Sequence, residues 1–250
     1  MGKNKKILSF TVFLLTLAII DLMIGESKIS LFSISNLSKT DRVILFDIRL
    51  PEVLSSVTIG LSLGLGGAIM QTILNNPLAD PFTLGVSSAA GFGASLLLLL
   101  GLSLSYVAFG ALIFSLLSMV FVYYISKKKN MDTEDMILAG IAVKFFFDSL
   151  ISLLQYLATD ETLSSIVFWL FGNVSKTSYR QILIIAIVFL IVLLLSLKDS
   201  WKLMAMRFGE TRARAMGVDT SSLKIRSFIR VSVLALSLIH ISEPTRPRLI

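Results

Sequence analysis

Long apolar stretches, each close to the thickness of a lipid bilayer, recur along the whole chain. A run of about 18 or more apolar residues with few charges is typical of a membrane-spanning helix. The composition agrees, because 55% of the 250 residues are hydrophobic and 16% are charged, against about 45–50% and about 25% in soluble domains. The alternation of a transmembrane barrel is absent. We therefore predict an all-α polytopic membrane bundle, in which each helix satisfies its own backbone hydrogen bonds.

Six helical spans are predicted, and a seventh begins near residue 225. The six cover residues 7–24, 50–74, 82–101, 104–125, 136–158 and 181–197. The first follows the basic stretch MGKNKK, so a cleaved signal peptide is the alternative for it. No clear small-x-small cleavage site follows, which favours an uncleaved span. The apolar run 166–171 is too short to cross a bilayer, and we expect a short helix or a re-entrant piece there.

The basic residues of this chain, whose net charge is +7, cluster beside the apolar spans. No aromatic-and-basic groove pattern accompanies them, so the positive-inside rule explains the charge better than nucleic-acid binding does. Residues 1–6, 126–130 and 198–224 together hold roughly twice as many Lys and Arg residues as the opposite side. An even number of predicted spans separates these three segments. The charges therefore predict an inner or plasma membrane protein with a cytoplasmic N-terminus.

Two prolines interrupt the apolar sequence in MQTILNNPLADPFTLGVSSAAG, from Met70 to Gly91. Pro77 and Pro81 each remove a backbone donor and disfavour helix in the residue before them. One interpretation is an ordinary loop with Asn and Pro turn chemistry. The other is irregular backbone beside protein or a water-filled cavity. The second interpretation makes three polar residues candidates for the translocation path: Asn75, Asn76 and Asp80.

Three glycines lie on one face of the predicted span 50–74. Gly60, Gly64 and Gly67 follow one another at spacings of four and three residues. Small residues at this spacing let a second helix approach closely. We therefore predict helix packing at this face.

Two opposite charges lie inside the predicted span 136–158, where ionisable residues are costly. Lys144 and Asp148 are four residues apart, so they can form an ion pair on one helix face. Asp148 falls near mid-membrane at about 1.5 Å per residue. The pair is a candidate for lining the translocation path. A mutually neutralised pair in a packed interface is the alternative.

The segment 198–224 is polar, basic and lies on the side predicted to be cytoplasmic. Within it, GETRARAMG is expected to form a short helix, with Glu210 near its N-terminal end and Gly217 as its C-terminal stop. Two short helices here would present a docking surface. A solvated loop is the alternative.

No catalytic constellation is found in the sequence. The chain has one histidine and no cysteine, and no phosphate-binding loop of the G-x-x-x-x-G-K-[ST] kind occurs. We therefore expect a chain that is not an enzyme and binds no metal or cofactor.

The stretch from Arg49 to Ala94 carries a resemblance to a known family. It has an Arg-Leu-Pro start, a glycine-rich span, an Asn-Pro-Leu-Ala-acid-Pro break and then Leu-Gly-Val-Ser, in that order. This resembles the FecCD and BtuC-like permease subunits of ABC importers for iron–siderophores, haem and vitamin B12. MILAGIAV at 136–143, FWLFGNVS at 168–175 and LMAMRFGETRARAMGVD at 203–219 are similar to later family segments.

The resemblance implies the partners of this chain. Two cytoplasmic ATPase subunits would bind and hydrolyse ATP, a binding protein on the outer side would deliver the chelate, and a second permease copy or homologue would complete the pathway. The segment 203–219 matches the family's loop that couples to the ATPase. The residues implied in coupling are Gly209, Glu210, Arg212, Ala213 and Gly217. Which chelate is carried stays open.

The end of the chain departs from the family, which has a roughly ten-span fold. LIHISEPTRPRLI places a histidine, charges and prolines where apolar residues are expected. We expect residues 1–238 to form an incomplete permease domain and 239–250 to be a foreign tail such as a fusion scar, with a divergent terminus as the alternative. Two other functions stay open at this point: an ion-coupled secondary transporter that uses Lys144 and Asp148, and a membrane-anchored assembly protein.

Overall fold

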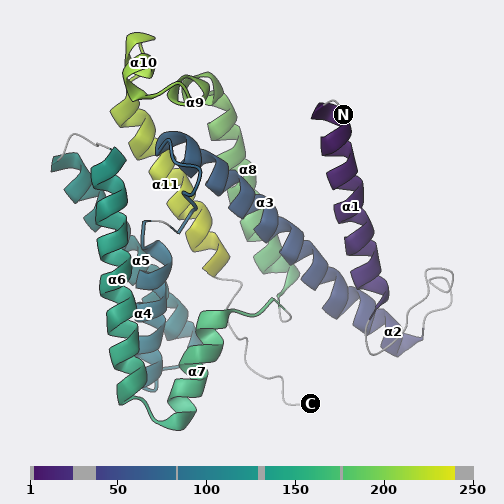
Figure 1. Ribbon diagram of the computed structural model, residues 1–250. Coiled ribbons are helices and arrows are strands. Elements are labelled where there is room, and N and C mark those ends of the chain that lie inside the picture. Colours follow the sequence, from purple (N-terminus) through teal and green to yellow (C-terminus); the bar gives the residue numbers. More distant parts are fainter. Residues whose placement is uncertain (1–2, 25–37, 83, 129–132, 175–176, 240–250) are drawn as a thin grey trace.

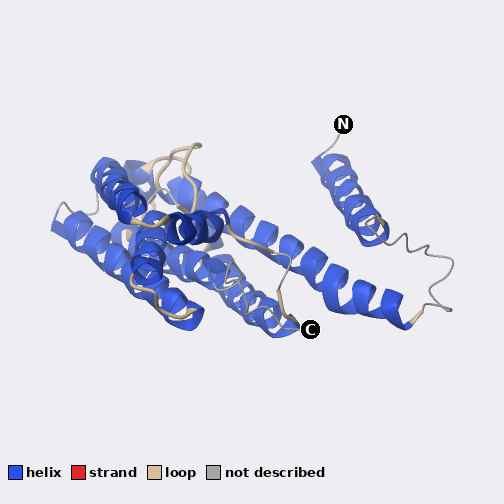
Figure 2. Ribbon diagram, turned by 90° about the horizontal axis from the view of Figure 1, so that it is seen from below, coloured by secondary structure: helices blue, strands red, loops and turns tan. Residues whose placement is uncertain are grey.

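A computed structural model of the chain describes residues 3–24, 38–82, 84–128, 133–174 and 177–239. No strand occurs among these residues, and the predicted all-α fold is confirmed (Figures 1 and 2). The helices are α1 (Lys3–Met23), α2 (Lys39–Val43), the π-helix η2 (Ile44–Arg49), α3 (Leu50–Ile73), α4 (Val86–Leu99), α5 (Leu104–Lys128), α6 (Thr133–Leu157), α7 (Asp160–Phe171), α8 (Tyr179–Lys198), α9 (Ser200–Met206), α10 (Glu210–Ala215) and α11 (Thr220–Ile239).

Five of the described helical segments are long and apolar enough to cross a membrane. They contain α1, α3, α5, α6 and α8. The predicted span 82–101 is wrong at its start, because Gly85 has a left-handed φ of 75° and α4 begins only after it. The 14 residues of α4 measure about 21 Å, less than the roughly 30 Å of a hydrocarbon core. The short helix expected near 166–171 is α7, which the Thr159 side chain caps.

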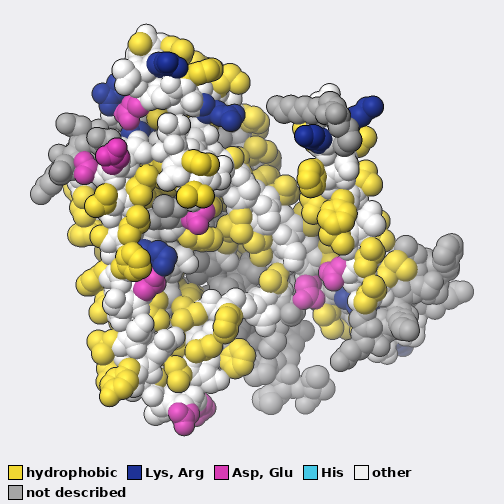
Figure 3. Space-filling view, viewed as in Figure 1, with side chains coloured by type: hydrophobic (Ala, Val, Ile, Leu, Met, Phe, Trp, Pro, Cys, Tyr) yellow, Lys and Arg dark blue, Asp and Glu magenta, His cyan; other side chains and the backbone are white. Residues whose placement is uncertain are grey.

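The two ends of the bundle differ in what they carry (Figure 1). The start of α1, the end of α3 and helices α9 and α10 lie at one end, which we call the α10 end. Helices α2 and α7 lie at the other, the α7 end. Dark-blue basic side chains gather at the α10 end and at the start of α1 in Figure 3. The start of α1 and the described segment 198–224, which the charges place on one side of the membrane, therefore lie at the same end of the fold.

Small residues allow α4 and α5 to approach closely. A Cβ on Gly93 would lie 2.5 Å from the carbonyl oxygen of Gly110, so neither position has room for a side chain. Three rings contact one another between α4, α5 and α6, and Phe114 meets both Phe92 and Phe147 edge-on. Helix α11 packs against α3 and α8, and the main apolar core joins residues of α3, α6 and α11, among them Met70, Met136 and Phe228.

The glycine face predicted on α3 does not pack against any described part of this chain. A Cβ on Gly60, Gly64 or Gly67 would meet no atom within 4 Å. The close approach on α3 is instead made by Gly66, where a Cβ would lie 3.0 Å from Cγ of Pro81. Spacing along α3 showed that three glycines share a face, but the path of the loop after α3 decides which glycine is covered. Packing of the open face against another chain stays a prediction.

Candidate functional site

The break after α3 begins as a regular helix ending built on asparagine. Asn75 has a φ of 43°, the left-handed conformation that Asn tolerates better than most residues. The N–H of Asn76 donates to Gln71 O at 3.1 Å, and the N–H of Asn75 donates to Thr72 O at 3.4 Å. This pair of bonds is the Schellman motif, which satisfies carbonyls that the helix end would leave open. Pro77 follows directly, because it cannot continue the helix.

The side chains of Asn76 and Asp80 order the rest of the break. Asn76 Oδ1 accepts from the N–H of Leu78 at 2.9 Å, and Asp80 Oδ1 accepts from the N–H of Phe82 at 2.7 Å. Both are Asx turns, in which a side chain replaces a backbone acceptor two residues away. The loop chemistry expected from the sequence is therefore present. The role of Asn75, Asn76 and Asp80 in translocation stays a prediction.

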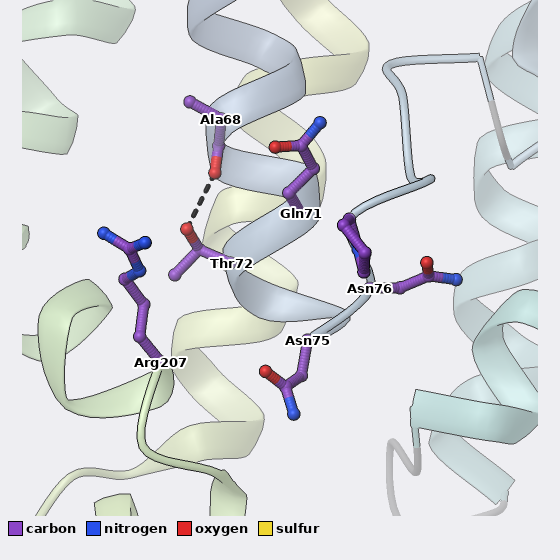
Figure 4. Close-up of a pocket in the computed structure, with 7 residues that line it drawn as sticks. Ala68, Gln71, Thr72, Asn75, Asn76 and Arg207 are labelled. Atoms are coloured by element: carbon purple, nitrogen blue, oxygen red, sulfur yellow. Dashed lines mark hydrogen bonds between the residues drawn. The ribbon is translucent and has the colours of Figure 1, made fainter.

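A pocket of about 400 Å³ opens beside this break at the α10 end. It is lined by Ala68, Gln71, Thr72, Asn75, Asn76, Pro77 and Arg207. Figure 4 shows the Arg207 side chain running alongside α3 toward Thr72, whose hydroxyl is bonded to Ala68 O at 2.7 Å. Asn76 points away from Arg207. The pocket joins the α3 break to the segment that links α9 and α10.

Helices α9 and α10 form the two-helix unit expected between residues 198 and 224. Helix α10 begins at Glu210 after Gly209, whose φ is 99°, and the chain turns at Gly217, whose φ is 82°. The predicted start and stop of this helix are confirmed. Ala213 is fully buried in an apolar cluster with Ala205, Met206, Val218 and Leu223. This cluster holds α10 on α9 and on the start of α11.

Helix α10 lies beyond the end of α8. The 20 residues of α8 span about 30 Å, the thickness of a hydrocarbon core. Asp199, at the end of α8, is paired with Arg230 of α11. Arg230 follows the first residue of α11, Thr220, by about 15 Å of helix. The start of α11 and the preceding α10 therefore project past the end of α8, as Figure 1 shows.

This projecting unit exposes large apolar side chains together with arginines. Met204, Phe208 and Met216 are 65%, 58% and 54% exposed. Arg207 and Arg212 are also exposed. Apolar side chains gathered outside the bilayer mark a protein interaction site more often than a free surface. We call these five residues the docking surface.

A charge network built around the fully buried side chain of Lys224 lies beneath the docking surface. Glu210 Oε2 is 2.6 Å from Nζ of Lys224, whose side chain is fully buried, and Glu210 Oε1 is 2.7 Å from Nη2 of Arg214. Burial raises the pKa of Glu210, whereas hydrogen bonds from Lys224 and Arg214 lower it. The lowering effects together are larger, so the pKa of Glu210 lies below its ordinary value of 4.5. The sequence had predicted a role for Glu210 but not for Lys224. The sequence signal for Lys224 was its position near the start of a largely apolar helix, where a buried charge needs a partner.

The comparisons with known proteins decide the family. The model of the FecCD transport family matches residues 12–244 of the chain. This chain belongs to the FecCD transport family. One relative is the molybdate import permease MolB of Haemophilus influenzae, which is 32% identical over 88% of this chain and 69% of its own length. Another is the vitamin B12 import permease BtuC of Vibrio vulnificus, which is 30% identical over 88% of this chain and 67% of its own length. At this level of description, the chain is a membrane permease of the ABC importer type.

A solved structure supports the fold of this FecCD-family chain. It is described as an inward-facing conformation of a metal-chelate type ABC transporter. The match has a TM-score of 0.83 at 30% identity and covers 96% of this chain and 76% of that one. The family membership does not support the two other functions left open by the sequence, an ion-coupled secondary transporter and an assembly protein.

The predicted ion pair of the FecCD-family chain is formed. Lys144 Nζ lies 2.7 Å from Asp148 Oδ2, and the two side chains are 49% and 39% exposed. Figure 3 shows basic and acidic side chains on the otherwise largely yellow and white flank over α6. The structure therefore excludes burial of this pair among the described helices. Whether a partner chain or the translocation path covers it stays a prediction.

The candidate residues fall into two groups in space. Asn75, Asn76 and the coupling residues lie at the α10 end, where the pocket brings both asparagines together with Arg207. Lys144 and Asp148 lie about three and four helical turns along α6 from its first residue, Thr133. Among the described residues, no group of three or more His, Cys, Asp or Glu side chains could hold a metal ion.

Proposed function

We propose that this chain is the permease subunit of an ATP-driven importer for a metal chelate such as an iron–siderophore, haem or a cobalamin. The similarity to a metal-chelate type ABC transporter over 96% of this chain supports this substrate class. Relatives include a hemin transport permease of Yersinia pestis and the vitamin B12 import permease. The molybdate import permease marks the competing substrate, an oxyanion.

The docking surface carries the functional proposal. It projects past the end of α8, is anchored from below by Ala213, and combines exposed apolar side chains with arginines. A partner with an apolar cleft and acidic rim fits this combination. In an ABC importer, the partner at the coupling segment is the ATPase. The proposal therefore places the α10 end in the cytoplasm, together with the N-terminus.

The α7 end is then the side that receives substrate. An extracytoplasmic binding protein would deliver the chelate there, and a second copy of the permease or a homologue would complete the pathway. Lys144 and Asp148 fit a surface that meets a partner chain or a water-filled path, because exposed charges at membrane depth do not face lipid. ATP acts through the ATPase, and the permease itself binds no cofactor.

Charge reversal on the docking surface tests the ATPase contact. Arg212→Glu places a carboxylate on α10, and Arg180→Glu, an exposed arginine at the start of α8 near the α7 end, is the matched control. We expect Arg212→Glu to lose most of the ATPase that co-purifies with the permease, while Arg180→Glu keeps it. Equal ATPase retention by both variants contradicts docking at α10.

Uptake into proteoliposomes that contain the permease, the ATPase and the binding protein tests the substrate class. A labelled ferric siderophore, haem, cobalamin and molybdate are offered separately, with and without ATP. We expect ATP-dependent uptake of one of the three chelates. Uptake of molybdate alone overturns the substrate class, and uptake that ignores ATP depletion overturns the importer proposal itself.

A further inference from the structure

One buried ammonium group links three helices at the α10 end. The side chain of Lys224, in α11, has no exposed surface. Its Nζ donates to Glu210 Oε2 in α10 at 2.6 Å and to Thr133 Oγ1 in α6 at 2.8 Å. Thr133 is 91 residues from Lys224 in sequence and is the first residue of α6. One side chain therefore contacts both the docking helix and α6.

The other side of Glu210 is also held. Its Oε1 accepts from Arg214 Nη2 at 2.7 Å and from Thr220 Oγ1 at 3.0 Å, and Arg214 Nε donates to the same hydroxyl at 3.0 Å. Both carboxylate oxygens thus have charged or polar donors. Movement of α10 that withdrew Glu210 would break its 2.6 Å bond to the fully buried Lys224, and breaking a bond to a buried charge costs more than losing an exposed pair.

The apolar anchor of α10 does not reach α6. Among the described residues, the cluster around Ala213 draws on α9, α10, the turn after α10 and the start of α11. The hydrogen bond from Lys224 to Thr133 therefore supplies a polar connection to α6 that this cluster lacks. Thr133 begins the same continuous helix of 25 residues that carries Lys144 and Asp148.

We infer that Lys224 is a positioning residue that transmits movement of the ATPase-docked α10 to α6, with Thr133 as the receiving group. This inference rests on the proposed docking of an ATPase at α10. Lys224 touches neither the ATPase nor the substrate. It acts by making the positions of Glu210 and Thr133 depend on one another through a fully buried ammonium group, since hydrogen bonds to a buried group are stronger than those in water.

Distances between spin labels test the transmission, and the chain suits them because it has no cysteine. Cysteines for labels are introduced in pairs at exposed positions. The pair at Ala215 and Leu61 reports α10 against α3 without replacing a residue of the docking surface, and the pair at Leu138 and Leu61 reports α6 against α3. Each pair is measured in the complex with the ATPase, with and without a non-hydrolysable ATP analogue. In the wild-type background, we expect both distances to change with nucleotide.

Two variants break the link at different atoms. Lys224→Met removes the ammonium, and Thr133→Val removes only the receiving hydroxyl at nearly constant volume. We expect both to keep the nucleotide-dependent change at α10 and to lose it at α6, with ATP-dependent uptake lower by at least about fivefold. Thr133→Ser restores the hydroxyl and is expected to restore both. Arg226→Met, which removes an exposed base from the same helix, is expected to match wild type.

The outcomes separate this inference from the proposed function. An unchanged α6 response in Thr133→Val overturns transmission through Lys224, even if Lys224→Met fails to fold. A wild-type chain that does not bind the ATPase overturns both the docking proposal and this inference. ATPase binding by Thr133→Val, together with loss of the α6 response and rescue by Thr133→Ser, is the result that supports transmission.

Discussion

Arg230 of α11 donates a hydrogen bond from Nη2 to Asp199 Oδ2 across 2.7 Å, although the two residues are 31 positions apart. Their side chains are 11% and 6% exposed. Asp199 joins α8 to α9, so this pair fixes the depth at which α11 passes the corner between them. The Arg230–Asp199 pair therefore helps to position the start of α11 and the preceding helix α10, which project past the end of α8.

Arg230→Met is expected to destabilise the chain strongly, because it leaves the buried Asp199 carboxylate without its main partner. Removing one member of a buried ion pair costs about 3–5 kcal/mol. Thermal unfolding in detergent measures the loss. Lys202→Met is the matched control, since Lys202 lies 3.3 Å from the same carboxylate but is 30% exposed. A Lys202→Met effect as large as that of Arg230→Met contradicts this account.

The stability of the α10 end is expected to fall in acid. The pKa of Glu210 is lower in the folded chain than its ordinary value of 4.5, so the unfolded chain binds more protons in that range. The stabilisation from Glu210 is therefore complete above about pH 4.5 and is lost as the pH falls through the lowered pKa. Unfolding measured between neutral pH and about pH 3 should show a smaller acid loss in Glu210→Gln than in wild type. Identical pH profiles would remove Glu210 as a contributor.

Neutralising Lys144 or Asp148 alone is expected to cost more stability than replacing both with Ser. A single replacement leaves one uncompensated charge at membrane depth, worth about 3 kcal/mol, whereas the double replacement leaves none. A double-mutant cycle on unfolding measures this coupling. Uptake by the same variants tests the path. Full uptake by the double Ser variant removes both residues from the translocation path.

Glycine positions on α4 and α3 are expected to respond oppositely to alanine. Gly93→Ala forces a Cβ to within 2.5 Å of Gly110 O, so α4 and α5 must separate, at a cost of about 1–3 kcal/mol. Gly60→Ala meets no atom within 4 Å, and we expect neutral or slightly raised stability of the isolated chain, by up to about 1 kcal/mol. Unfolding midpoints compare the two. Lost uptake in a stable Gly60→Ala variant would show that a partner covers this face.

Local features of this chain were predictable because neighbouring residues determine them. The apolar runs predicted helices, and the chemistry of asparagine and proline predicted the turn after α3. Glu210 and Gly217 marked the ends of α10, since helix ends depend on the residues within one turn. The Lys144–Asp148 pair followed from spacing alone on a single helix. The start of α4 was missed, because the chain turns there at Gly85, which packs so closely on α6 that a Cβ would lie 2.9 Å from the backbone nitrogen of Lys144.

The sequence by itself therefore determined a helical membrane permease of a recognisable family, with the ends of α10 and the ion pair between Lys144 and Asp148. Only the tertiary structure decided that Lys224 meets Glu210 and Thr133, that Arg230 meets Asp199, and that Gly66 rather than Gly60 is covered. The physical reason is the distance along the chain over which each kind of interaction acts. Backbone conformation and i,i+4 pairs are decided within a few residues, whereas buried partners across tens of residues depend on how whole helices cross.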